Sequence, residues 1–310
     1  MATLVIGGGG FIGRHLLHLL VETGRQVTVL DRRTHPVQDL PAGVSYLAED
    51  FGDTVAIRHL LDSHQEVIHL AYATVPNTSF EDPLADLQGN LPPTVRLFAE
   101  LAERGRRLVL VSSGGTVYGE ARRLPICEEH PTHPISPYGV TKLTLENYAR
   151  LYGVTHGLKY VCVRPSNAYG VGQLPFMGQG FIATAIASAL KGVPVRIFGR
   201  NGTVRDYLHV RDLAMGILAA LESGRLSETY NLGSGIGYTN LQVLELLSPM
   251  LANFGCRMLI EHFPERLFDV RANLLDSSKL SKDTGWMPKV EFLHGLVEMV
   301  DWLRMQHSDG

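Results

Sequence analysis

The feature that most constrains this chain is a glycine-rich segment between a short apolar run and a longer amphipathic one. Residues 7–13 read Gly-Gly-Gly-Gly-Phe-Ile-Gly, directly after Leu4-Val5-Ile6 and before an amphipathic stretch that extends to Thr23. Glycines at this spacing allow a tight turn from a strand into a helix, and Gly13 allows the helix to pack closely on the strand. Backbone N–H groups at the start of such a helix attract a pyrophosphate. The segment therefore predicts a strand, a turn and a helix that together bind a phosphate group.

Further apolar runs follow this turn and are separated by helical patterns. Continuous apolar strands of this kind are typical of a parallel sheet that is covered on both faces. The runs are residues 4–6, 27–30, 67–71, 108–112 and 160–164. We therefore predict an α/β fold with a doubly wound parallel sheet, the Rossmann arrangement.

The pattern changes after Pro165. A Gly- and Pro-rich segment at 170–180 precedes a helical stretch at 181–190, and the later strand signals are shorter. We expect a dinucleotide-binding Rossmann domain over residues 1–165 and a smaller C-terminal α+β substrate lobe over residues 166–310. The apolar run at 229–232 is expected to return to the main sheet, within a returning segment near 203–235.

Composition and charge exclude several classes of protein. Of the 310 residues, 45% are hydrophobic and 19% are charged, which is the balance of a globular chain with a real core. The net charge of −3, without a long run of either sign, argues against a nucleic-acid binder or a membrane-surface protein. The chain shows neither a secretory signal nor a long apolar span, so we expect a cytoplasmic protein. Its three cysteines are scattered, with no metal-binding spacing, so we expect reduced thiols and no metal.

An acidic residue, Asp31, ends the second predicted strand. A carboxylate at this place binds the ribose hydroxyls of an adenosine and repels a 2′-phosphate, which favours NAD over NADP. Arg32 and Arg33 follow directly and would tolerate that phosphate, so NADP stays open at this point. Asp50 and Phe51, after a third strand signal, are placed to meet an adenine ring.

A tyrosine and a lysine, Tyr138 and Lys142, begin a helical stretch that runs to Tyr152. The i, i+4 spacing places both side chains on one face of the helix. A phenol with a pKa of about 10 is a poor base at neutral pH, but a neighbouring cation, helped by a positive nicotinamide ring, lowers that pKa. Tyr138 is therefore the predicted proton acceptor. Lys142 is predicted to activate it and to hold the nicotinamide ribose. An ordinary exposed helix surface is the alternative for such a pair taken alone.

Together these segments resemble the extended short-chain dehydrogenase/reductase family, and within it nucleotide-sugar epimerases such as UDP-glucose 4-epimerase. The resemblance covers nearly the whole chain and includes segments 69–71, 112–119 and 164–170. It implies Tyr138 and Lys142 as the catalytic pair. The residues that it implies for NAD binding are Gly7, Gly10, Phe11, Ile12, Gly13, Asp31, Asp50, Phe51, Leu70, Ala71, Asn90, Tyr138 and Lys142.

The resemblance extends into the second half of the chain. Segment 202–212 is similar to the family segment that carries a diphosphate-binding arginine, which implies that Arg205 binds the diphosphate of the substrate. The resemblance implies the same role for Arg266, and a planar guanidinium suits phosphate oxygens. Asn167 would contact the diphosphate or the sugar. Asn273 lies near the place where such enzymes limit the substituent on the second carbon of the sugar, and its intermediate size would not exclude an N-acetyl group.

One position departs from the family pattern. Gly114 stands where the family normally has a Ser or Thr that hydrogen-bonds the reacting sugar hydroxyl. Thr116, Ser113 or a water in the space left by the missing Cβ are the candidates to replace it. The same stretch also lacks the adjacent Asp-Glu pair of the related 4,6-dehydratases.

These observations favour NAD-dependent 4-epimerisation of a nucleotide-diphospho-sugar, with a UDP-hexose expected. The resemblance implies a transient 4-keto sugar that accepts the hydride back on its other face. The alternatives are an NAD(P)-dependent nucleotide-sugar reductase, a 4,6-dehydratase and a non-catalytic dinucleotide sensor. The resemblance also implies a homodimer that forms through the helical stretches 91–104 and 138–152.

Overall fold

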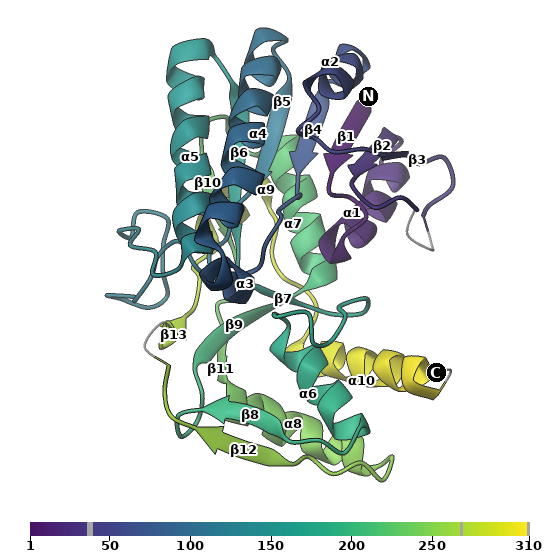
Figure 1. Ribbon diagram of the computed structural model, residues 1–310, viewed down its shortest axis with the longest axis vertical. Helices are drawn as coiled ribbons and strands as arrows, with labels where there is room; N and C mark the ends of the chain where they lie inside the picture. The colour runs from purple at the N-terminus through teal and green to yellow at the C-terminus, as the bar shows by residue number, and fades with distance from the viewer. Residues whose placement is uncertain (36–39, 267–268, 309–310) are drawn as a thin grey trace.

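A parallel sheet and a smaller second lobe make up the structure, a computed structural model that describes residues 1–35, 40–266 and 269–308 (Figure 1). Within these residues the sheet has seven strands in the order β10-β6-β5-β4-β1-β2-β3, and each neighbouring pair is parallel. The strands are β1 (Ala2–Ile6), β2 (Gln26–Asp31), β3 (Ser45–Ala48), β4 (Glu66–His69), β5 (Arg107–Val111), β6 (Lys159–Pro165) and β10 (Thr229–Leu232). The predicted doubly wound sheet is confirmed, and its strand order reverses between β1 and β4, where ligands bind in such sheets.

Helices cover both faces of this sheet, because its strands are apolar on both sides. α1 (Phe11–Glu22) and α7 (Val210–Ser223) pack on one face, together with α9 (Ser278–Thr284). α2 (Thr54–Ser63), α4 (Pro83–Glu103) and α5 (Pro137–His156) pack on the other. Between these two apolar layers, the turns that follow the strands all lie at one end of the sheet, the end where the parallel strands finish.

Helix α4 is longer than the pattern predicts. The expected helix at 91–104 begins already at Pro83, where the Asp82 side chain accepts a hydrogen bond from the Ala85 N–H (2.9 Å). It continues through Pro92 and Pro93, although proline removes backbone donors from a helix. Residues on both sides of the two prolines are buried against the sheet and α5, so tertiary packing overrides the local preference.

The second lobe joins a small sheet to three helices. β7 (Asn167–Tyr169), β9 (Val204–His209), β11 (Gly237–Thr239) and β13 (Ala272–Asn273) form one sheet, and β8 (Val195–Phe198) pairs with β12 (Ile260–Phe263). Around them lie α6 (Phe181–Leu190), α8 (Asn240–Ala252) and α10 (Phe292–Ser308). Of the expected returning segment, β10 pairs with β6 in the main sheet and α7 packs on its face. β9 instead pairs with β7 in the second lobe. The division into two domains stays a prediction.

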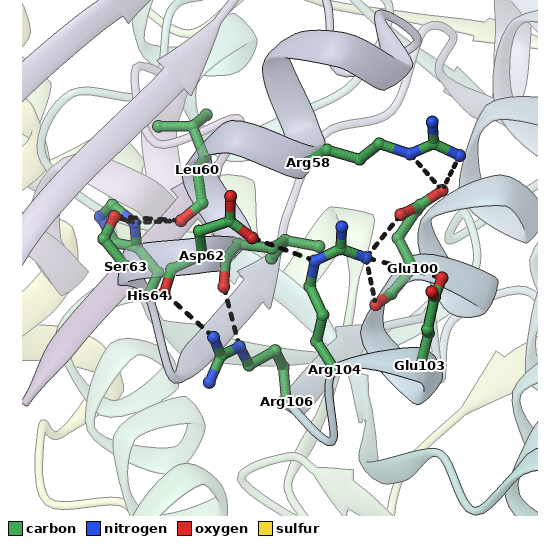
Figure 2. A network of polar contacts seen from close by, with 10 residues as sticks. Arg58, Leu60, Asp62, Ser63, His64, Glu100, Glu103, Arg104 and Arg106 are labelled. Atoms are coloured by element: carbon green, nitrogen blue, oxygen red, sulfur yellow. Dashed lines mark hydrogen bonds and ion pairs between the residues drawn. The ribbon is translucent and has the colours of Figure 1, made fainter.

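At the end of the sheet where β5 begins, a charged network joins α2 to α4 (Figure 2). Glu100 accepts hydrogen bonds from Arg58 (2.8 Å) and from Arg104 (2.7 Å). Arg106 donates to the carbonyls of Leu61 (2.8 Å) and Asp62 (3.1 Å). This network holds the end of the sheet that lies away from the turns after β1 and β4. Within the described part of the chain, no helix combines the length and the apolar character that a membrane crossing requires.

Candidate active site

A cavity of about 1590 Å³ runs from the turns after β1, β2 and β4 into the second lobe. Its wall begins at the glycine turn, passes Tyr138 and Lys142, and ends at Arg205 and Arg266. Typical pockets for one small ligand measure about 300–1,000 Å³. The cavity is therefore large enough to hold two ligands, one at each end.

The glycine turn fits a dinucleotide. Gly7 has a φ of +82°, and a Cβ on it would lie 2.5 Å from the main-chain nitrogen of Ala71. A Cβ on Gly13 would overlap the carbonyl oxygen of Gly8. Only glycine satisfies both positions, and the turn lines the cavity at the N-terminus of α1, where the helix dipole favours phosphate.

Asp31 lies at the end of β2 beside this turn. Its carboxylate accepts hydrogen bonds from the N–H of Gly9 (3.0 Å) and of Arg33 (3.2 Å), and it lines the cavity. The Arg33 guanidinium donates to the Gly9 carbonyl (2.6 Å). That contact holds Arg33 against the turn. The guanidinium that could bind a 2′-phosphate therefore already has a hydrogen-bond partner within the protein. The arrangement favours NAD.

The other predicted cofactor residues divide into two groups. Asp50, Phe51, Leu70 and Ala71 line the cavity, as do Gly10, Phe11 and Ile12 of the turn. Asn90 is buried instead, and it is absent from the wall of the cavity within the described residues. Its side-chain oxygen accepts from the Ala73 N–H (2.8 Å), and its side-chain nitrogen donates to the Asp86 carbonyl (2.6 Å). Main-chain groups thus bind both ends of the Asn90 amide, and its contact with the cofactor stays a prediction.

Helix α5 brings the tyrosine and the lysine to the cavity. Ser136 caps the helix by accepting from the Gly139 N–H (3.1 Å), and Pro137 occupies its first position. This start places Tyr138 in the first turn and Lys142 one turn later, and both residues line the cavity. The Lys142 ammonium donates to the Val111 carbonyl at the end of β5 (2.9 Å).

Burial dominates the electrostatics of this pair. It lowers the pKa of Lys142 to about 8, because a charged ammonium loses its hydration inside the protein. Burial also raises the pKa of the Tyr138 phenol, and the negative charge of Asp86 raises it further. The expectation that Lys142 lowers the tyrosine pKa is therefore not met by the chain alone. A phenolate at Tyr138 requires additional positive charge, which the nicotinamide ring of a bound NAD would supply.

The space beside Gly114 is filled. A Cβ on Gly114 would lie 2.8 Å from the Arg164 carbonyl oxygen and would overlap the side chain of Leu275. Leu275 is fully buried in an apolar cluster with Val117 and Tyr118. The suggestion that a water fills the room left by the missing Cβ is wrong, because Leu275 occupies that room.

Thr116 is the hydroxyl that the structure leaves available. Both Thr116 and Ser113 line the cavity. The Thr116 Oγ1 is buried and finds no hydrogen-bond partner among the residues that the structure describes. A buried hydroxyl without a partner is unfavourable, so a bound ligand is the natural source of that partner. Thr116 is therefore the stronger candidate to replace the hydroxyl that is missing at Gly114.

Asn273 does not have the place that the resemblance implies. It is buried on β13, and its side-chain amide donates to the Gly114 carbonyl (2.9 Å). Among the described residues it is not part of the cavity wall. β13 pairs with β9, and the Asn273 side chain reaches inward to the backbone of residue 114, so a contact with the sugar stays a prediction that these bonds do not support.

The two predicted arginines have different surroundings. Arg205 is half-buried, and its guanidinium donates to the carbonyls of Val204 (2.9 Å) and Val270 (2.7 Å). Burial lowers the pKa of Arg205. Arg266 forms an ion pair with Asp269 (2.7 Å) and lies over the Phe198 ring (4.0 Å). Residues 267 and 268 of the predicted arginine segment lie outside the described residues.

The positive charge of Arg205 is thus the less compensated of the two, and it is the better candidate for a diphosphate. Asn167 lines the same cavity, and its Oδ1 lies 3.2 Å from the place of a Cβ on Gly115.

The cavity wall also includes residues that were not predicted from the sequence, among them Tyr72, Gln173 and Tyr207. The side-chain oxygens of Gln173 and Tyr207 are buried and unpaired within the described ranges of the chain. Tyr207 follows Arg205 by two positions on β9, and period-two alternation could have placed both on one face. Tyr72 directly follows Ala71 at the end of the turn after β4, which is itself a sequence signal for the ligand edge of the sheet.

The fold and the site define the class of protein: an extended short-chain dehydrogenase/reductase, with a dinucleotide turn and a Tyr-x-x-x-Lys pair on one cavity. The sequence profile of the NAD dependent epimerase/dehydratase family matches residues 3–233. The chain belongs to that family.

Relatives match over nearly the full length of the chain. A putative UDP-glucose 4-epimerase of Methanocaldococcus jannaschii is 32% identical and is covered for 98% of its length, against 97% of this chain. A dTDP-glucose 4,6-dehydratase of Actinoplanes is also 32% identical, over 99% of both chains.

Solved structures agree with these matches. The UDP-glucose 4-epimerase of Thermotoga maritima, solved with UDP-glucose, is 33% identical with a TM-score of 0.91 and covers 99% of this chain and 100% of its own. That of Thermus thermophilus, solved with NAD, is 34% identical with a TM-score of 0.89, over 98% and 99% of the two chains.

Proposed function

We propose that this protein is an NAD-dependent nucleotide-sugar epimerase that inverts the fourth carbon of a UDP-hexose. The observation that carries the proposal is the position of Tyr138 and Lys142 in a single cavity, with a dinucleotide turn at one end and Arg205 at the other. A cofactor and a nucleotide-linked sugar would meet at this pair. The relatives named above, one solved with UDP-glucose and one with NAD, support this assignment.

The glycine turn and Asp31 would hold NAD, which would supply reversible hydride transfer to and from either face of the sugar carbon. Tyr138 would take the proton of the sugar hydroxyl and later give it back. The reaction would therefore consume neither protons nor reducing equivalents overall. Lys142 would favour the phenolate by its charge, and the Thr116 hydroxyl would hydrogen-bond the reacting oxygen. Arg205 would hold the diphosphate while the sugar turns.

The dehydratase alternative lacks its chemistry at this site. Elimination of water from a sugar needs an acid and a base beside the sugar ring. Among the described residues that line the cavity, the carboxylates are Asp31, Glu49, Asp50 and Asp269. The first three lie at the ends of β2 and β3, and Asp269 is paired with Arg266. Residues 113–116 supply only hydroxyls, which favours epimerisation over dehydration.

The experiment is a substrate panel with purified protein. UDP-glucose and UDP-galactose come first, followed by UDP-N-acetylglucosamine, dTDP-glucose, GDP-mannose and CDP-glucose, with products identified by proton NMR. The expected result is the 4-epimer of a UDP-hexose and the absorbance of bound NAD(H) in the protein. A 4-keto-6-deoxy product would identify a dehydratase instead, and net consumption of added NADPH would identify a reductase.

A variant of the tyrosine separates an enzyme from a dinucleotide sensor. Tyr138→Phe is expected to lower turnover by at least about 10²-fold while the NAD content stays the same. Tyr148→Phe, on a more exposed part of the same helix, is the matched control and keeps full turnover. Equal activities of the two variants would exclude Tyr138 as the base.

The proposal includes a homodimer that forms through α4 and α5. Exposed apolar side chains on these helices support it, namely Leu84, Leu87, Val140, Leu151 and Val154. Light scattering of the eluting protein should give twice the mass of the chain, and Val154→Glu with Leu151→Glu should give the single mass. The expected cytoplasmic location stays a prediction.

A further inference from the structure

Tyr72 is an aromatic residue in the cavity wall whose backbone is held on both sides. The N–H groups of Leu70 and Ala71 both donate to the Ile6 carbonyl (2.9 and 3.0 Å). The Ala73 N–H donates to the side chain of Asn90 (2.8 Å). These bonds join the end of β4 to β1 and α4, so the main chain on both sides of Tyr72 is fixed.

This ring contacts both members of the catalytic pair. The Lys142 Nζ lies 4.1 Å from the centre of the Tyr72 ring, and the rings of Tyr72 and Tyr138 meet edge to face with centres 4.7 Å apart. The Lys142 Nζ lies farther, 5.7 Å, from the centre of the Tyr138 ring. Tyr72 is therefore a shared neighbour of Tyr138 and Lys142.

The Tyr72 hydroxyl adds a weaker link to the same group. It lies 3.5 Å from the Asp86 carboxylate and 3.5 Å from the Tyr138 carbonyl. Asp86 is fully buried and accepts hydrogen bonds from Thr141 (2.6 Å) and from Thr74. Burial and the charge of Asp86 raise the pKa of Tyr72, so its ring is that of a neutral phenol.

Lys142 needs such a neighbour because the residue, with its charged ammonium, is only 6% exposed. The groups that face it are Asp86 of α4, Glu146 of α5, Cys162 of β6 and His69 of β4. Glu146 is already paired with Arg164 (2.6 Å), and burial holds the pKa of His69 at about 3, so that imidazole is neutral. An aromatic face attracts a desolvated ammonium without adding a further buried charge.

We propose that Tyr72 is a positioning residue of the active site, whose ring holds the protonated Lys142 against the Val111 carbonyl and fixes the phenol of Tyr138. The inference rests on the proposed function for the roles of Tyr138 and Lys142. The contacts themselves do not depend on it.

The first test measures Lys142 directly and needs neither cofactor nor sugar. Labelling of lysines by acetic anhydride, followed by mass spectrometry from pH 6 to pH 10, gives the apparent pKa of Lys142, with the exposed Lys282 as internal reference. Tyr72→Leu and Tyr72→Met remove the ring, and Tyr72→Phe keeps it. The pKa of Lys142 should fall by about one in the first two variants and stay unchanged in the third. Thermal melts show which variants fold. Two apolar replacements are made so that the test can still be read if one of them does not fold.

The second test uses turnover. Tyr72→Leu should lower kcat by about tenfold with little change in KM for the nucleotide sugar, since the ring acts on the pair and not on the diphosphate. Its alkaline limb of kcat should move to lower pH, because Lys142 loses its proton earlier. Tyr72→Phe should restore both.

An unchanged pKa of Lys142 in the folded Leu or Met variant would overturn the proposal, whatever the turnover. So would a phenylalanine variant as defective as the leucine one. If no sugar of the panel is epimerised, the proposed function fails, and the labelling result still decides the role of Tyr72.

Discussion

At the scale of single residues, packing around Gly114 decides which hydroxyl can serve the reaction. The backbone of Gly114 lies against the side chain of Leu275 and the carbonyl of Arg164, and its own carbonyl accepts from Asn273. A serine in the usual family position would have to displace that packing. Thr116 lies two positions farther along the same segment and lines the cavity, and its buried Oγ1 has no hydrogen-bond partner among the residues that the structure describes.

Restoring the family residue should therefore harm the protein. Gly114→Ser is expected to lower the free energy of unfolding by about 1–3 kcal/mol, because the new side chain meets Leu275 and the Arg164 carbonyl. Urea unfolding measures this. Gly115→Ser is the matched control, since a Cβ there meets only the side chains of Asn167 (3.2 Å) and Ser113 (3.9 Å). A stable Gly114→Ser variant with faster turnover would contradict the account.

Thr116 should show opposite effects on activity and stability. Thr116→Val keeps the shape and removes the hydroxyl, so kcat should fall by about 10²-fold. Stability should stay equal or rise by about 1 kcal/mol, because an unpaired buried hydroxyl is removed. Thr116→Ser should retain turnover, and Ser113→Ala should change it less than about threefold. Rates and melting temperatures of the three variants check this, and a fully active valine variant would eliminate Thr116.

At the scale of elements, charged contacts outside the site fix how the helices sit on the sheet. Glu100 of α4 joins Arg58 of α2 to Arg104 at the C-terminus of its own helix (Figure 2). The Glu100 side chain is 8% exposed, so its pairs are better shielded than ordinary surface pairs. The hydrogen bond from Arg58 is the main cause that lowers the pKa of Glu100 below its usual value.

Glu100→Gln should reduce stability in a pH-dependent way. The pKa of Glu100 is depressed in the folded state, so its contribution is present above the unfolded pKa of about 4.5 and is lost as pH falls through the folded value. The expected loss is about 1 kcal/mol at pH 7 and becomes smaller as the pH falls from about 4.5 to about 3. Glu103→Gln is the control, since the Glu103 side chain is 75% exposed. Thermal unfolding at both pH values measures the difference, and an equal loss at pH 3 would argue against the ion pairs.

At the scale of the whole molecule, one cavity connects the two lobes. The main sheet supplies the glycine turn, and α5 on that sheet supplies Tyr138 and Lys142. The second lobe supplies Arg205 on β9 and the residues around it. The proposed cofactor residues and the proposed diphosphate-binding Arg205 thus lie in different lobes, so we expect cofactor binding and substrate binding to be separable by mutation.

Arg205→Met should weaken the substrate and leave the cofactor in place. A lost charge-assisted contact to phosphate corresponds to a rise in KM for the nucleotide sugar of about 10- to 100-fold. Arg266→Met should have a smaller effect, because Asp269 already compensates part of its charge. Arg200→Met, at an exposed position, is the control. Steady-state kinetics and the NAD absorbance of each variant measure this, and loss of NAD in the Arg205 variant would contradict the assignment.

Much of the fold could be predicted, since its signals are local. The apolar runs, the glycine turn and the return of residues 229–232 to the main sheet were all available from the pattern, and the structure confirms them. The start of α4 at Pro83 was not, because packing against α5 and the sheet overcomes two prolines inside the helix. The side-chain amides of Asn90 and Asn273 both donate to main-chain carbonyls inside the protein, and no spacing in the sequence predicts these contacts.

The glycine turn, Asp31 and the Tyr138–Lys142 pair were determined by the sequence itself. Each depends on residues a few positions apart: a turn that only glycine can make, an acid at a strand end, and an i, i+4 pair on one helix face. Only the tertiary structure decided that Leu275 fills the space at Gly114, that Thr116 keeps an unpaired hydroxyl in the cavity, and that Tyr72 lies against Lys142. These contacts join segments that are distant along the chain, so they arise only when close packing brings the elements together.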